Sequence, residues 1–96
     1  MGIFEKIVVK IIKEQELIIG PLAWSEASKV SGIAVLDKNT MQVSISSPDP
    51  KEAVDQLVNQ YQRLFGRASK EVCKDAVASI IADLAPADIP LSLRVA

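Results

Sequence analysis

The chain has 96 residues, of which 49 % are hydrophobic and 24 % are charged, a balance typical of one folded globular domain and not of a disordered segment. Its net charge is −1, so it lacks the basic excess with which nucleic-acid-binding proteins neutralise phosphate, and we expect no nucleic-acid partner. Because so short a chain buries only a modest core, association is a natural source of extra stability.

Cys73 is the only cysteine, and the chain has no histidine. A single cysteine rules out a disulfide within the chain and fits a reducing compartment, so we expect a cytoplasmic protein. Cys73 falls on the apolar side of a predicted helix, where a buried and unreactive thiol is expected. Histidine-based triads, metal sites and pH switches are excluded. We therefore expect no enzyme activity, no metal and no cofactor.

Residues 3–19 are predicted to form an amphipathic helix. At about 100° per residue, the charged side chains lie on the side opposite the apolar ones. The competing interpretation is a strand over residues 6–12, which is disfavoured because the charges do not alternate with a period of two. The same charges break the apolar run, so we expect neither a signal peptide nor a membrane span. The apolar face comprises Phe4, Ile7, Val8, Ile11, Ile12, Ile18 and Ile19.

Gly20 and Pro21 are expected to end this helix and to turn the chain into a second, short helix over residues 21–30. Glycine suits the left-handed position just past a helix end, and proline fits the first turn of a new helix. The corner therefore joins one helix to another. The residues expected to face inward are Leu22, Ala23, Ala27 and Val30.

Two short strands are predicted next, over residues 33–36 and 41–46, with a turn-rich segment between them. Alternation of polar and apolar residues in the second strand places Met41, Val43 and Ile45 on one face. A β-hairpin is the simplest interpretation. Two strands alone are only marginally stable, so the hairpin has to pack on helices or on further strands.

The second half of the chain is predicted to be helical. Asp49 and Glu52 are typical of a helix cap and a capping box, with a first-turn proline between them, and Gly66 ends that helix. A fourth helix is expected over residues 69–84. The alternating tail, residues 89–95, is expected to be an edge strand or disordered chain. The predicted fold is one α+β domain over residues 1–96, in the order α-α-β-β-α-α, with the hairpin packed on the helices.

Five residues are predicted to form an interface with another protein chain. The first helix is strongly apolar, and a polar residue inside such a seam, Gln15, can set register or partner choice. Trp24 lies one position off the inward face of the short helix, and tryptophan is enriched at interface hot spots, although a place in the core is the commoner use of this residue. The predicted interface consists of Phe4, Val8, Ile11, Gln15 and Trp24.

A basic stripe is predicted if the two late helices are continuous, since Arg63, Arg67, Lys70 and Lys74 are spaced four, three and four residues apart. Such a stripe would suit an acidic partner or a phosphate group. Gly66 interrupts the spacing and acidic residues flank it, so a solvated face of mixed charge is the alternative interpretation.

The sequence favours a small, non-catalytic interaction or accessory protein, regulatory in character, that forms a homodimer or docks on a larger protein. One alternative is a small-molecule-binding regulator with a pocket lined by Trp24, Met41 and Tyr61. Another is a helix-turn-helix DNA-binding regulator, but residues 22–30 lack the arginines and amides that read bases. A third, a first helix lying on a membrane surface, is disfavoured because its three glutamates offset its three lysines.

Overall fold

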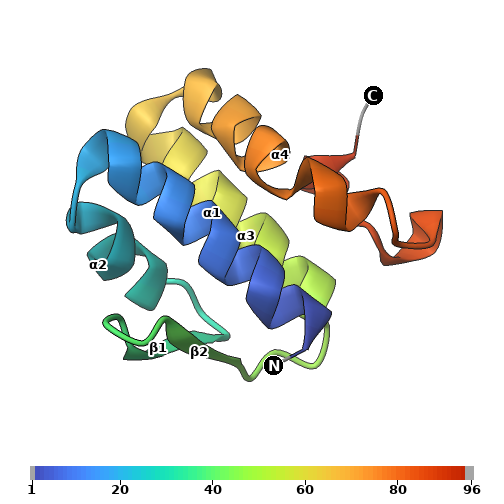
Figure 1. Cartoon of the computed structure of the whole chain (residues 1–96), viewed down its shortest axis with the longest axis horizontal. Helices are drawn as coiled ribbons and strands as arrows, with labels where there is room; N and C mark the ends of the chain where they lie inside the picture. The colour runs from blue at the N-terminus through green and yellow to red at the C-terminus, as the bar shows by residue number, and fades with distance from the viewer. Residues whose placement is uncertain (1, 95–96) are drawn as a thin grey trace.

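The computed structural model describes residues 2–94, which form four α-helices, a two-stranded antiparallel sheet and two short 3-10 helices (Figure 1). The predicted α+β class and the order α-α-β-β-α-α are confirmed. In chain order the elements are α1 (Ile3–Ile19), α2 (Leu22–Ser28), β1 (Ile33–Asp37), β2 (Gln42–Ile45), α3 (Pro50–Phe65), α4 (Arg67–Ile81), η1 (Pro86–Asp88) and η2 (Leu91–Leu93).

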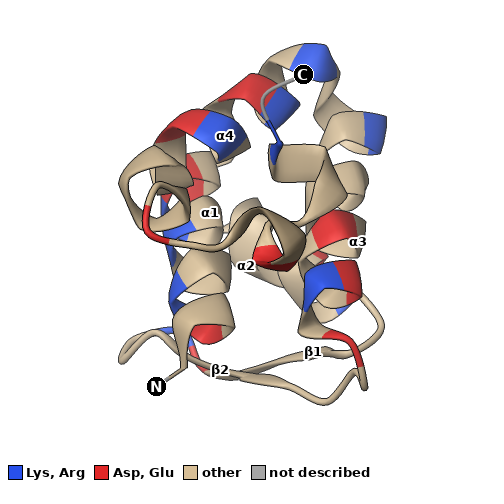
Figure 2. Ribbon diagram, turned by 90° about the vertical axis from the view of Figure 1, so that its right-hand side faces the viewer, with Lys and Arg blue, Asp and Glu red and all other residues tan. Residues whose placement is uncertain are grey.

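Helix α1 lies at the centre of the fold, because it contacts α2, α3, α4 and strand β2. Helices α1 and α3 run in about the same direction, while α2 and α4 run back beside them (Figure 1). The hairpin packs below the helices against α1 and α2 (Figure 2). The last turns of α1 and α3 therefore lie at the same end of the molecule as the first turns of α2 and α4.

A single apolar cluster fills the space between these elements, and all four helices and both strands contribute to it. No helix in the described part of the chain is long and apolar enough to cross a bilayer. The side chains with no exposed surface in this cluster are Ile7, Val8, Ile11, Ile12, Ala23, Ala27, Val54, Leu57, Val58, Tyr61, Cys73 and Val77.

The predicted helix-to-helix corner is confirmed. Gly20 has a φ of 70°, and its N–H donates to the carbonyl of Glu16 over 2.9 Å, which closes the last turn of α1. Leu22 is 44 % exposed, so its inward assignment was wrong. Helical side chains lean toward the helix N-terminus, and Leu22 is the first residue of α2, so no earlier turn of this helix lies beside its side chain. The other predicted inward residues are buried: Ala23, Ala27 and Val30.

The predicted hairpin is also confirmed, with Ile33 opposite Ile45 and Val35 opposite Val43. Val43 is buried and Ile45 is partly buried against the core. Met41, however, lies in the turn with a φ of 58° and is exposed, so its predicted place on the strand face was wrong. A turn that needs a positive φ at this position removes the residue from the pleated strand.

The cap of α3 forms as expected, but the capping box does not. The Asp49 carboxylate accepts from the backbone N–H of Lys51 over 3.0 Å. The backbone N–H of Asp49 donates to the hydroxyl of Ser47 over 3.3 Å. The Glu52 carboxylate, which a capping box would place on that N–H, accepts from the side-chain amide of Gln56 instead. Ser47 has therefore taken the role that a capping box gives to the acidic residue.

The tail is neither disordered nor an edge strand over its described part. It forms η1 and η2, and the Asp55 carboxylate of α3 accepts from the backbone N–H of Ser92 over 2.9 Å. Leu93 is buried against the core. Pro90 lacks the N–H group that a strand would need, whereas it fits the position just before the 3-10 helix η2. Val95, the last residue of the predicted strand, lies outside the described residues.

Candidate functional site

The predicted interface residues of α1 lie inside the chain's own core. Val8, Ile11 and Gln15 have no exposed surface, and Phe4 is partly buried against the same cluster. Three helices and β2 surround α1, so its apolar face is satisfied within the chain. These residues are therefore corrected from surface to core positions, and a surface for association has to be sought elsewhere.

Gln15 joins α1 to α4. Its amide Nε2 donates to the carbonyl of Ser69 over 3.0 Å and to the sulfur of Cys73 over 3.4 Å, whereas its Oε1 has no hydrogen-bond partner. Cys73 is buried, as predicted, and burial raises the pKa of its thiol to about 11. The protonated thiol is a poor nucleophile, so this pair holds two helices together and offers no reactive group.

Trp24 is also a core residue, only 5 % exposed, and its indole N–H donates to the Glu16 carboxylate over 2.7 Å. Tyr61 is fully buried, and its hydroxyl donates to the carbonyl of Ala23 over 2.6 Å. Burial raises the pKa of Tyr61 well above its usual value. Tyr61 is enclosed, and the edge of Trp24 lines a surface hollow that neither Met41 nor Tyr61 shares. The three side chains therefore do not line one pocket, and the predicted pocket was wrong.

The predicted basic stripe is divided between two helices. Arg63 lies in the last turn of α3, whereas Arg67, Lys70 and Lys74 lie along α4, beyond the break at Gly66. Lysines and acidic residues alternate along α4 (Figure 2). The ammonium of Lys74 also lies 3.9 Å from the Glu71 carboxylate. The four cations therefore do not form one continuous line.

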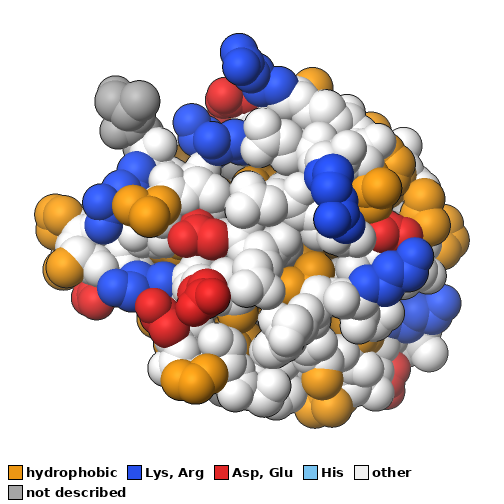
Figure 3. Space-filling model, turned by 180° about the vertical axis from the view of Figure 1, so that it is seen from behind, with side chains coloured by type: hydrophobic (Ala, Val, Ile, Leu, Met, Phe, Trp, Pro, Cys, Tyr) orange, Lys and Arg blue, Asp and Glu red, His pale blue; other side chains and the backbone are white. Residues whose placement is uncertain are grey.

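Large apolar side chains are exposed at the end of the molecule where α1 and α3 stop and α2 begins. We call this set the apolar end; viewed from behind, hydrophobic side chains gather at the corresponding right-hand edge, beside lysine and arginine side chains (Figure 3). Isolated exposed leucines are ordinary, but a group of this size on a small monomer is typical of a contact surface. Its members and their exposed fractions are Leu17 (80 %), Ile18 (61 %), Leu22 (44 %), Leu64 (47 %) and Phe65 (36 %).

Sequence periodicity did not single out the apolar end. Ile18 and Leu22 fit the apolar sides of their helices and were predicted to face inward, and Leu64 and Phe65 follow the helical spacing of α3. Their exposure follows from their position in the first or last turn, where the neighbouring helices no longer cover them. The sequence signal for such a surface is the presence of apolar residues in the terminal turns of several helices, but it becomes visible only when the topology brings those turns together.

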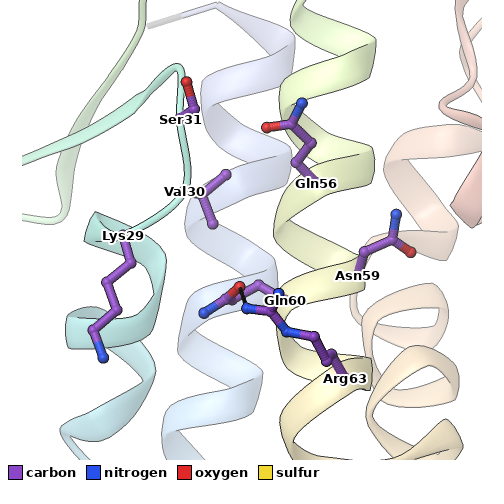
Figure 4. A pocket seen from close by; sticks show the side chains of 7 residues that line it. All are labelled: Lys29, Val30, Ser31, Gln56, Asn59, Gln60 and Arg63. Atoms are coloured by element: carbon purple, nitrogen blue, oxygen red, sulfur yellow. Dashed lines mark hydrogen bonds between the residues drawn. The ribbon is translucent and has the colours of Figure 1, made fainter.

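A second surface feature is a groove of about 480 Å³ between the end of α2 and one side of α3 (Figure 4). Ligand sites in proteins commonly have volumes of about 300–1,000 Å³. Polar side chains dominate the walls, and Figure 4 shows those of α3 on one side and those of α2 and its following loop on the other. The lining residues are Lys29, Val30, Ser31, Gln56, Asn59, Gln60 and Arg63.

A buried carboxylate lies beside this groove. Glu26 is 6 % exposed and accepts from the ammonium of Lys29 over 2.9 Å and from the amide of Gln60 over 2.8 Å. The bond from Lys29, then that from Gln60, lowers the pKa of Glu26. Arg63 in turn donates to the amide oxygen of Gln60 over 2.6 Å. The four side chains form one hydrogen-bonded chain that fixes which way the Gln60 amide points.

Among residues 2–94, no group of three or more acidic, cysteine or histidine side chains is placed to hold a metal ion. Comparisons of the chain with protein-family models, curated proteins and solved structures gave no match. The candidate sites therefore rest on the geometry of this chain, namely the apolar end and the groove beside Glu26.

Proposed function

We propose that this protein acts by association, without chemistry of its own, and that the apolar end is where a second copy of the chain binds. The observation that supports the proposal is the exposure of five large apolar side chains at one end of a small protein, whereas other exposed ones, such as Leu36 and Leu91, lie on separate elements. Covering one leucine or isoleucine side chain stabilises a complex by about 1.5–3 kcal/mol before the costs of association are subtracted.

Charges around the apolar end favour a second copy over an oppositely charged partner. Arg67 and Lys70 lie at the start of α4, and Glu14 and Glu16 lie near the end of α1, where Glu14 borders α4 and Glu16 accepts from Trp24 of α2. Charges of both signs therefore lie close to the apolar end, so a second copy could offer each charge an opposite one. Such self-complementarity is what an isologous dimer requires.

The helix-turn-helix alternative has less support. In α2, which would be the recognition helix, Ala23, Trp24, Glu26 and Ala27 are buried. Few side chains are left to reach base edges in a DNA groove, and the one buried charge is acidic. Association through the apolar end does not depend on base-reading arginines or amides in α2, whereas DNA binding would.

Sedimentation velocity over a concentration series tests the proposal. We expect a dimer for the unchanged protein. Leu17→Glu should weaken dimer association at least about tenfold, because a charge replaces a desolvated side chain at the contact. Leu91→Glu is the matched control: Leu91 is 70 % exposed but lies in the tail, away from the apolar end, and its replacement should leave the dimer intact.

Two results would contradict this assignment. A monomer at every concentration would exclude the second copy as the occupant and direct attention to a larger protein partner. A dimer that Leu17→Glu and Leu91→Glu weaken equally, or not at all, would place the contact elsewhere on the molecule. Circular dichroism of both variants checks that neither substitution has unfolded the chain.

A further inference from the structure

The groove between α2 and α3 is rich in hydrogen-bond donors. Its lining carries two cations, three primary amides and a hydroxyl, and no acidic side chain. Lys29 spends one ammonium N–H on Glu26, which leaves two. Within residues 2–94, Arg63 donates one side-chain hydrogen bond, to Gln60, which leaves four of its five N–H groups. A ligand suited to these walls brings several acceptor oxygens.

Glu26 holds the donor side chains in place but does not cancel the positive charge of Lys29 and Arg63. Two cations face one carboxylate, so an excess of one positive charge remains at this part of the groove. Glu26 is almost fully covered and does not line the groove, while Lys29 is well exposed. Through Gln60, the same carboxylate also positions Arg63. Both cations are therefore tied to one carboxylate before any ligand arrives, Lys29 directly and Arg63 through Gln60, which lowers the cost of ordering them.

Two nearby features could repel an anion, and the structure limits both. The carbonyls of Glu26 and Ala27 at the end of α2 already accept from the N–H groups of Lys29 and Val30. The Glu52 carboxylate lies beyond Gln56, whose amide it binds at the other end of the groove. The favourable position for a negative charge is thus the end beside Lys29 and Arg63.

We propose that this groove binds a small molecule through an oxyanion group, either a phosphate or a carboxylate, held by Lys29 and Arg63. Arginine and lysine both donate charge-assisted hydrogen bonds to such oxygens. A volume of about 480 Å³ leaves room beside the anion for an organic body, which Asn59, Ser31 and Val30 would contact. This site is separate from the apolar end and does not rest on the association proposed above.

Titration of the isotope-labelled full chain by two-dimensional NMR tests the site, with sodium phosphate and sodium malonate as probes and sodium chloride at equal ionic strength as the reference. We expect saturable shifts confined to amides of residues 26–31 and 56–63. The probe that saturates at the lower concentration distinguishes a phosphate from a carboxylate ligand.

Variants decide whether the two cations carry the binding. Arg63→Gln and Lys29→Gln should each weaken it about tenfold, the loss expected for a charge-assisted hydrogen bond. Lys10→Gln, which removes an exposed lysine of α1 outside the groove, should leave it unchanged. Shifts equal to those in sodium chloride, shifts spread over the whole surface, or equal weakening in all three variants would overturn the proposal. Because the variants change exposed side chains, the dispersion of their spectra should confirm an intact fold.

Discussion

Tyr61→Phe tests whether a single buried hydroxyl links two helices of the core. The Tyr61 hydroxyl of α3 donates to the carbonyl of Ala23 in α2 over 2.6 Å, and the ring is fully buried. The variant keeps the ring and loses the bond. The α-helical pattern still gives the Ala23 carbonyl a backbone partner, so we expect a loss of about 1–2 kcal/mol, not the larger cost of an orphaned acceptor. The thermal midpoint should fall by about 4–16 °C.

The same variant should change how stability depends on pH. Burial raises the pKa of Tyr61 well above its ordinary value of 10.0, so the folded chain keeps a proton that the unfolded chain loses. The contribution of Tyr61 to the stability of the wild type is therefore fully present below pH 10 and falls as the pH rises above it, by about 1.4 kcal/mol per pH unit. Phenylalanine cannot ionise, so the difference between wild type and variant should narrow and then reverse in alkali.

Cys73 contributes to the alkaline loss in both proteins. Burial raises the pKa of its thiol from 9.0 to about 11, so both lose stability from about pH 9, and the thiol accounts for about 2–3 kcal/mol of that loss by pH 11. This shared background makes the difference between wild type and Tyr61→Phe the quantity to measure. Urea unfolding followed by circular dichroism, at neutral pH and through the alkaline range, provides it.

Because Tyr61 is the only tyrosine, the ultraviolet absorbance of tyrosinate reports on this one hydroxyl. We expect tyrosinate to form only as the helical signal is lost. Tyrosinate that appears near pH 10 with the helical signal unchanged would refute the reasoning, since the hydroxyl would then be open to water. Equal stability of the two proteins at neutral pH would refute the contribution assigned to the hydrogen bond.

Two further changes test the tail and the break between α3 and α4. Asp55→Ala removes the acceptor of the Ser92 bond, so it should lower the free energy of unfolding by about 1–2 kcal/mol and speed amide exchange across residues 89–94. Asp88→Ala, at an exposed position, is the control and should do neither. Gly66→Ala should cost about 1–3 kcal/mol in urea unfolding, because a φ of 90° with a ψ of −178° is a backbone conformation that residues other than glycine rarely adopt, even though the added Cβ would meet no neighbouring atom within 4 Å. Unchanged stability would contradict this backbone geometry.

Local signals predicted most of the fold because they act within one turn of the chain. Glycine and proline at residues 20 and 21, the Asp49 cap and Gly66 each impose a backbone geometry that needs no distant partner. The tail shows the limit of such signals. Its alternation is typical of a strand, but a strand also needs an open edge to pair with, and the contact that decided its shape, from Ser92 to Asp55, joins residues 37 positions apart.

The candidate interface failed for a related reason. An apolar helix face has the same sequence pattern whether it is covered by its own chain or by another, so Val8 and Ile11 could not be assigned from periodicity alone. What separates the two cases is how far the neighbouring elements extend. Around the middle of α1 they cover the whole apolar face, whereas at residues 17 and 18 they leave it exposed.

The groove beside Glu26 could not have been predicted from spacing, because its parts are ordinary residues when taken singly. Lys29 and Glu26 form a common pair on one helix, and the amides of α3 match any solvated helix face. Only the packing of α2 on α3 brings Glu26 within 2.8 Å of Gln60, 34 residues away, and thereby links Arg63 to the hydrogen-bonded chain that includes Lys29. Covering the Glu26 carboxylate costs desolvation, which its two donors offset: Lys29 on the same helix and the chain-distant Gln60. The same bonds fix the positions of two accessible cations, which is the arrangement that an anionic ligand needs.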